Sequence, residues 1–177
     1  MGPTGQSWPT QKATNSASSA PATSETAECM LTTESTVPAH RIPELTDLMR
    51  TAWWMTDRTP ADVHHLLDHS DLVIAVTHDP TDQLVGFARV LTDYAYVALI
   101  LDVIVAESHR GSGVGAVLLD AVVDHPALTD VRSLELVCQP ALIPFYHRWG
   151  FTTEVGTSHL MRRTTDPRLT AQPVADH

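Results

Sequence analysis

A long apolar run that leads at once into a glycine-rich loop constrains the fold of this sequence most. Residues 94–105 are almost all apolar and rich in aromatic and β-branched side chains, which predicts a strand. Residues 107–110 then lead into three closely spaced glycines, Gly111, Gly113 and Gly115. Beyond the loop, apolar residues recur at helical spacing, at Val114, Val117, Leu118, Ala121 and Val122. The segment is therefore predicted to form a strand, a glycine loop and a helix in direct succession.

This succession is suited to binding an anion. The first N–H groups of a helix have no partner inside the helix, and the helix dipole adds positive potential at that end. Glycines let a ligand approach the backbone without meeting a Cβ atom. Arg110 adds a guanidinium, which can donate two hydrogen bonds to phosphate oxygens. We expect the loop to bind a pyrophosphate.

Two interpretations of this loop are open. The pattern Gly111-x-Gly113-x-x-Ala116 fits a loose dinucleotide-binding fingerprint, and Glu135 follows about twenty residues later. However, a dinucleotide fold turns directly from strand into loop, whereas four polar residues intervene here. The fold also needs several further strand–helix units, for which too few residues remain. This first interpretation is therefore the less favoured one.

The second interpretation rests on two motifs. The pattern Arg110-x-x-Gly113-x-Gly115 resembles the acetyl-CoA loop of the GCN5-related N-acetyltransferases, the GNAT superfamily. Residues 144–151, Pro-Phe-Tyr-His-Arg-Trp-Gly-Phe, resemble the late helix of that family, which ends in Tyr-x-x-x-Gly-Phe. The likeness covers roughly residues 31–163, and two motifs together are more specific than either alone.

Patterning elsewhere predicts the remaining elements. Helices are expected from Pro43 to near Met55 and from Pro60 to near Ser70, and Thr59 is positioned to cap the second. Strands are expected at residues 31–37, 72–77, 84–91 and 133–138, with two short ones within 152–163. This order predicts the α/β (α+β) class. The GNAT resemblance implies a central mixed, mostly antiparallel sheet flanked by helices.

Composition divides the chain into three parts. Residues 1–30 are dominated by Thr, Ser, Ala, Pro and Gln and cannot bury enough apolar area to fold, so we expect a disordered leader. Met30 stands where foldable sequence begins, and we hypothesise that the natural start lies there. Residues 31–165 are expected to form one GNAT-like acetyltransferase domain, and residues 166–177 a polar tail.

Charge and cysteine content limit the partners. The 177 residues carry a net charge of −10, whereas a nucleic-acid partner would require a basic face. No apolar run approaches the roughly 20 residues of a membrane helix, so no membrane partner is expected. No secretory signal is visible, and Cys29 and Cys138 are too far apart to suggest a disulfide framework. We expect a cytoplasmic protein with free thiols.

The resemblance assigns the cofactor residues. The backbone of Val103, Ile104 and Val105 would pair with the pantetheine arm of acetyl-CoA as a neighbouring strand does. The pyrophosphate would be bound through successive N–H groups of Arg110, Gly111, Ser112, Gly113, Val114 and Gly115. A merely buried strand and a structural glycine turn are the alternatives. Gln139 stands where the family often has an asparagine, seven residues before its tyrosine.

Tyr146 and Asp102 are the candidate catalytic residues. By resemblance, Tyr146 is the general acid that protonates the leaving thiolate, with a packed core aromatic as the alternative. Its helix is expected to begin near residue 143, because Pro144 does not fit deep inside a helix. Asp102 is a lone carboxylate in an apolar strand and a candidate base for the amine; a solvent-facing carboxylate is the alternative. Glu107 and His147 are further candidates.

The acceptor site is expected between the first two helices. Trp53 and Trp54 beside Asp57 would suit a cationic or aromatic amine, although helix packing also explains the tryptophans. Three histidines, His64, His65 and His69, include a pair at i, i+4 spacing. Because no carboxylate or thiol motif completes a metal site there, we interpret them as a polar helix face.

The resemblance implies an acetyl-CoA-dependent N-acyltransferase. It would move an acetyl group to a primary amine by direct transfer in a ternary complex, with acetyl-CoA as co-substrate and no metal. A non-catalytic CoA-binding regulatory or sensory module is the alternative from another class, and a dinucleotide-dependent oxidoreductase is the third. The acceptor, a small molecule or a peptide, stays open. So does a homodimer, an assembly that is frequent in the family.

Overall fold

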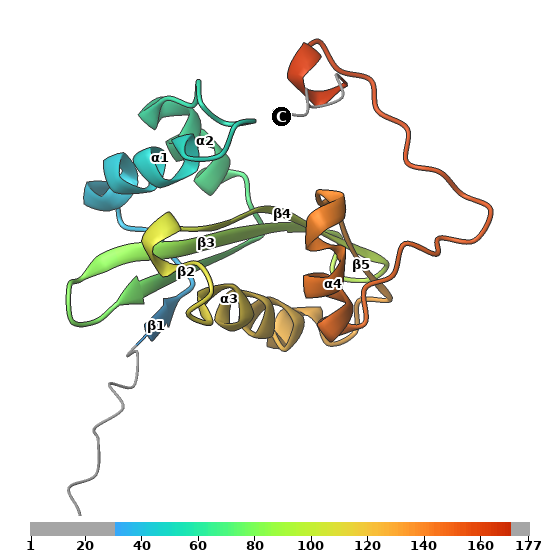
Figure 1. The fold of residues 1–177 in the computed structure, drawn as a ribbon. Coiled ribbons are helices and arrows are strands. Elements are labelled where there is room, and N and C mark those ends of the chain that lie inside the picture. Colours follow the sequence, from blue (N-terminus) through green and yellow to red (C-terminus); the bar gives the residue numbers. More distant parts are fainter. Residues whose placement is uncertain (1–30, 171–177) are drawn as a thin grey trace, which may run out of the picture.

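A single five-stranded sheet organises the chain (Figure 1). The computed structural model describes residues 31–170. The strands are β1 (Leu31–Glu34), β2 (Leu72–His78), β3 (Gln83–Thr92), β4 (Val97–Val105) and β5 (Ser133–Leu136). They lie in sequence order, with β1 to β4 antiparallel and β5 parallel to β4. The predicted mixed, mostly antiparallel sheet is confirmed.

Helices cover both faces of this sheet (Figure 1). They are α1 (Ile42–Arg50), α2 (Pro60–Asp68), α3 (Val114–Val123) and α4 (Ile143–Tyr146). Single 3₁₀ turns occur at Ala39–Arg41, Glu107–His109, Pro126–Leu128, Pro140–Leu142, His147–Trp149 and Pro167–Leu169. Within residues 31–170, none of the helices is long and apolar enough to cross a bilayer. The expected leader, Met30 and Cys29 lie outside the described residues.

The start of α2 follows from its sequence. The Thr59 side chain accepts a hydrogen bond from the Asp62 amide at 3.2 Å, and the Asp62 carboxylate accepts one from the Thr59 amide at 2.8 Å. This reciprocal arrangement satisfies two N–H groups that the first helical turn cannot pair. Pro60 occupies the first helical position, where its missing N–H has no consequence. The predicted helix start is confirmed.

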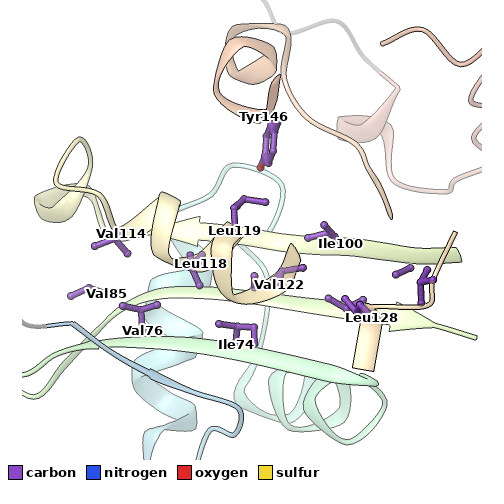
Figure 2. Close-up of a cluster of buried hydrophobic side chains, with 14 residues drawn as sticks. Ile74, Val76, Val85, Ile100, Val114, Leu118, Leu119, Val122, Leu128 and Tyr146 are labelled. Atoms are coloured by element: carbon purple, nitrogen blue, oxygen red, sulfur yellow. The ribbon is translucent and has the colours of Figure 1, made fainter. Parts of the chain in front are cut away.

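The core has two parts, one on each face of the sheet. On one face, α1 and α2 pack on the sheet through Leu45, Met49, Met55, Val63, Phe87 and Ile104. On the other, α3 and Tyr146 pack on it through Val76, Val85, Val90, Val114, Leu118, Leu119 and Val122 (Figure 2). The alternating burial of β3 side chains between these two clusters is what makes it a central strand.

Close approach of α3 to β3 depends on Gly86. A Cβ atom at Gly86 would lie 2.7 Å from Val114 Cγ1 and 3.1 Å from Leu118 Cδ1. The first distance is shorter than van der Waals packing allows and the second is tighter than most such contacts, so even one methyl group would require α3 to shift. Because Val114 is the first residue of α3, Gly86 sets the position of the glycine loop over the sheet.

The strands predicted within residues 152–163 are absent, and this expectation is wrong. The side chains there are exposed, including 60% of Val155, 71% of Leu160 and 91% of Met161. A strand is stabilised by pairing its backbone and by burying one face, and this segment does neither, although it lines a cavity together with β5. It runs outward from the sheet instead and returns to the side of α2 (Figure 1).

We predict that Gly86→Ala destabilises the fold by about 1–3 kcal/mol, because α3 must move to admit the methyl group. Denaturant unfolding monitored by tryptophan fluorescence measures the change. Gln83→Ala on the exposed end of the same strand is the matched control and should change stability far less. An unchanged unfolding free energy in Gly86→Ala would show that α3 does not pack as closely as described.

Candidate functional site

The site begins where β4 and β5 separate. The two strands pair only from Val97 to Ile100, opposite Ser133 to Leu136. β4 continues to Val105 and stays paired with β3 on its other side. Backbone groups of residues 101–105 on the β5 side therefore have no strand partner. The predicted pantetheine-pairing residues, Val103, Ile104 and Val105, all lie in this open stretch.

A bulge at Asp102 accompanies the separation. The β3–β4 register shifts between Phe87 and Arg89, and Asp102 has φ +52°, in the left-handed region. Such a conformation is rare for a residue with a Cβ atom, and at a β-bulge it bends the strand. The bulge turns the Asp102 side chain toward Arg89, whose Nε donates a hydrogen bond to Asp102 Oδ2 at 2.6 Å.

The glycine loop presents unpaired amides at the N-terminus of α3. Gly111 and Gly113 have φ +77° and +95°, and a Cβ atom at either would touch nothing, so their requirement is conformational. Among residues 31–170, the amides of Gly111, Gly113, Val114 and Gly115 have no hydrogen-bond acceptor. Residues 110–113 are exposed. The predicted anion-binding loop is therefore open to a ligand.

A glycine is needed at position 115 for a different physical reason, which is space for a neighbouring side chain. A Cβ atom there would lie 3.2 Å from Phe145 Cζ, so this glycine makes room for α4. Trp149 Nε1 also donates a hydrogen bond to Asp120 Oδ1 on α3 at 2.7 Å. These contacts hold the aromatic motif of residues 144–151 against the helix that carries the glycine loop. The two sequence motifs are thus joined in space.

Tyr146 lies between Phe145 and Trp149, whose contacts with α3 fix its position, and its own hydroxyl makes no hydrogen bond within residues 31–170. The residue is only 7% exposed, and Figure 2 shows its ring extending from α4 with the hydroxyl oxygen toward Leu119 and the sheet. No unpaired side-chain oxygen in the described residues is fully buried, so the Tyr146 hydroxyl is reached by solvent. Burial, together with the nearby Cys138, raises the pKa of Tyr146 to about 12. Burial likewise raises the pKa of the Cys138 thiol.

A cleft of about 1020 Å³ connects these features. Its walls come from the α1–α2 connection, β3, the separated ends of β4 and β5, α4 and the C-terminal segment. They include Trp53, Trp54, Asp57, Arg89, Leu101, Asp102, Val103, Cys138, Gln139, Tyr146, Arg162 and Arg168. The cleft therefore brings together the predicted acceptor residues (Trp53, Trp54 and Asp57), the candidate catalytic residues (Asp102 and Tyr146) and Gln139. Gln139 is exposed and precedes the 3₁₀ turn at Pro140–Leu142.

The tryptophan pair forms one rim of the cleft. The rings of Trp53 and Trp54 meet edge to face with centroids 5.4 Å apart, and Trp53 is 47% exposed. Asp57 is not free, because Arg168 Nη2 donates to its Oδ2 at 3.0 Å. Arg168 also binds the Asp166 carboxylate at 2.8 Å. The C-terminal segment is thereby tied across the mouth of the cleft.

Sequence reasoning missed Arg89 and Arg168. An arginine among buried apolar positions of a strand, with a lone aspartate in the next strand, was the available signal for the Arg89–Asp102 pair. For Arg168 the signal was the run Asp166-Pro167-Arg168, in which an aspartate caps a short turn that opens with proline. Either pattern indicates an ordered residue, although neither identifies its partner.

The remaining candidates lie outside the cleft. Glu107 is exposed in the 3₁₀ turn before the glycine loop, and His147 is exposed in the 3₁₀ turn that follows α4. On α2, His64 contacts Asp68 at 3.0 Å and His65 stacks on His69. No group of three or more metal-ligating side chains occurs among residues 31–170.

Comparison with known proteins agrees with this geometry. The sequence model of the acetyltransferase (GNAT) family matches residues 34–151. The uncharacterized N-acetyltransferase ycf52 of Porphyra purpurea is 30% identical over 110 residues, which are 61% of this chain and 63% of that protein. The chain thus spans less than two thirds of the length of that relative.

Solved structures share the fold. A crystal structure assigned to the GNAT acetyltransferases, from Xanthomonas campestris pv. campestris, superposes with a TM-score of 0.65 at 32% identity, covering 77% of this chain and 94% of its own. Diaminobutyrate acetyltransferase of Paenibacillus lautus, solved with its substrate and coenzyme A, superposes at 0.56 with 19% identity, covering 69% and 74%. The match over residues 34–151 confirms the predicted relationship: this chain belongs to the acetyltransferase (GNAT) family.

Proposed function

We propose that the protein transfers an acetyl group from acetyl-CoA to a primary amine. The observation that carries this proposal is the set of four unpaired amides at the start of α3, beside the open edge of β4. Helix N-termini with free N–H groups bind phosphate, and an open strand edge pairs with amide groups of an extended ligand. Pantetheine joined to a diphosphate combines both chemistries in one molecule, so the residues present fit acetyl-CoA.

This placement supports direct transfer in a ternary complex as the mechanism. The amine nitrogen attacks the thioester carbonyl carbon, the C–S bond breaks, and the amine loses one proton while the thiolate gains one. Asp102 and Tyr146 line the cleft where acceptor and thioester would meet, and they are the candidate base and acid. Proton transfer from a group within hydrogen-bond reach accelerates such steps by about 10²–10⁴-fold.

The environment of Tyr146 suits an acid. A pKa of about 12 keeps the phenol protonated throughout the physiological range, so the proton is always available. Complete transfer of the Tyr146 proton to an ordinary thiolate would be unfavourable, because a thiol normally has a lower pKa than this phenol. However, burial at this end of the cleft also raises the pKa of the Cys138 thiol. A CoA thiolate desolvated beside Cys138 would be destabilised in the same way and would accept the proton more readily.

A CoA-binding regulatory module is the second candidate function. The exposed loop and the open strand edge serve binding alone as well as they serve catalysis. What favours catalysis is the hydroxyl of Tyr146, which is unpaired within residues 31–170 in a site that is otherwise well packed. Because no unpaired side-chain oxygen in that range is fully buried, this hydroxyl is accessible, and Tyr146 lines the cleft in which it can meet a ligand.

Tyr146 should remain un-ionised at pH 10. In the double variant Tyr94→Phe, Tyr96→Phe it is the only tyrosine left. We expect the ultraviolet signal of phenolate to rise only near pH 12 in the folded chain, because burial disfavours the charged form. The same variant unfolded in denaturant is the control and should titrate near 10. A folded-state transition near pH 10 would contradict the described environment.

Tyr146→Phe should lower kcat by about 10²–10⁴-fold while acetyl-CoA affinity stays the same. The substitution removes a hydroxyl with no hydrogen bond inside the described residues, so the packing is kept. Steady-state thiol release measures kcat, and calorimetry measures the affinity. The matched control is Tyr96→Phe, in the exposed connection between β3 and β4. If no amine releases thiol from the wild-type protein although acetyl-CoA binds, the regulatory module is the better explanation.

Arg110→Ala should weaken acetyl-CoA binding roughly 10- to 100-fold, because a hydrogen bond to a charged group contributes about 1.5–3 kcal/mol. Arg110 is exposed, so folding should be unaffected. Arg132→Ala, an exposed arginine packed over Tyr96 outside the cleft, is the matched control. S-acetylpantetheine, which lacks the diphosphate, should bind both variants alike. Equal loss for the two ligands would overturn the phosphate assignment of the loop.

A further inference from the structure

The floor of the cleft holds a buried ion pair that presents unused donors. Arg89 Nε donates to Asp102 Oδ2 at 2.6 Å, and the two side chains are only 14% and 9% exposed. Both residues line the cleft. A guanidinium carries five N–H donors, and this contact uses one of them.

The terminal nitrogens of Arg89 have no acceptor among residues 31–170. Within the same residues, no fully buried side-chain nitrogen or oxygen lacks a partner. Nη1 and Nη2 are therefore reached by solvent, and the cleft is the space that Arg89 lines. The same holds for Asp102 Oδ1, which has no hydrogen-bond partner within residues 31–170 and is also reached by solvent. The pair thus offers a planar donor fork next to a carboxylate oxygen.

Two other arginines of the cleft, Arg162 and Arg168, already donate to groups of the protein. Arg168 is engaged by Asp57, Asp166 and Thr56. Arg162 is exposed and donates to the backbone oxygen of Leu169. The Arg89 side chain is only 14% exposed, is fixed by Asp102 and keeps a free fork, and a fork of this geometry matches a carboxylate with two parallel hydrogen bonds.

The charge balance of the cleft indicates what else the ligand carries. Among the described lining residues, four arginines face four aspartates: Arg58, Arg89, Arg162 and Arg168 against Asp57, Asp62, Asp102 and Asp166. Most of these groups are exposed or already paired with one another, so the largely buried pair of Arg89 and Asp102 is the part of the cleft that offers both signs to a ligand. Such a pair favours an acceptor that itself carries both signs, because each charge then finds an opposite partner.

We propose that the acceptor is an amino acid, a primary amine with a carboxylate close to the reacting nitrogen. The proposal rests on the acetyl-transfer function proposed above. The Arg89 fork binds the carboxylate, and Asp102 Oδ1 accepts a hydrogen bond from the amine. Arg89 is thereby the residue that determines acceptor specificity, and its contact with Asp102 places the two ends of the acceptor beside each other.

Matched acceptor pairs test this assignment. Thiol release from acetyl-CoA is measured with a panel of amino acids and with the carboxamide of each, which differ only in the anionic group. The wild-type protein should favour the acids by at least tenfold in kcat/KM. Equal rates, or a preference for the carboxamides, would overturn the proposal. A preference for aminoalkyl phosphonates over the acids would overturn the carboxylate assignment.

Variants locate the effect. Arg89→Lys retains one charge toward Asp102 but loses the fork, so KM for the acids should rise 10- to 100-fold with a smaller change in kcat, and KM for the carboxamides should change far less. Arg132→Gln, outside the cleft, is the control and should preserve the acid preference. A loss of equal size for acids and carboxamides would mean that Arg89 only supports the bulge. If Arg89→Lys does not fold, the wild-type selectivity alone decides.

The two proposals fail in different ways. Thiol release with simple amines, but without any preference for acids, would contradict the amino-acid acceptor and leave acetyl transfer intact. Acetyl-CoA binding without thiol release for any amine in the panel would contradict acetyl transfer itself.

Discussion

The departure of β4 from β5 after Ile100 is the constraint on which the rest of the structure depends. β4 keeps its pairing with β3 as far as Val105, so the divergence opens one edge of a strand whose other edge is fixed. Asp102 makes this turn in a left-handed conformation that costs a residue with a Cβ atom about 1–3 kcal/mol. The hydrogen bond from Arg89 holds the bulge in place and offsets part of that cost. One local distortion thus creates the open edge and aims a carboxylate into the cleft.

Glycines near the site serve two unrelated physical purposes. Gly111 and Gly113 supply positive φ where a side chain would meet no obstacle. Gly86 and Gly115 supply space, for α3 against the sheet and for Phe145 against α3. The first pair exposes the amides of the loop, and the second fixes where those amides stand relative to β4. A ligand that touches both the loop and the strand edge depends on the two pairs together.

The elements that could be predicted are those whose signals are local. The strand, loop and helix around residues 94–122, the capped start of α2 and the family motif at Tyr146 each depend on residues a few positions apart. What could not be predicted is contact between distant residues. Arg89 meets Asp102 across 13 positions, and Arg168 meets Asp57 across 111. Strand propensity in 152–163 failed for the same reason, since only the tertiary structure decides whether that segment pairs with β5 and buries a face.

Long-range and short-range electrostatics act on different ends of the proposed acceptor. The chain carries a net charge of −10, so its field attracts cations and repels anions over a distance of about 8 Å at physiological ionic strength. A carboxylate alone would be disfavoured on approach, whereas an amine would be favoured. Inside the cleft the balance changes, because the Arg89 side chain is only 14% exposed and its charge is screened less than the surface charges. A zwitterion is neutral in the outer field and finds both partners at the Arg89–Asp102 pair, which neither a simple cation nor a simple anion does.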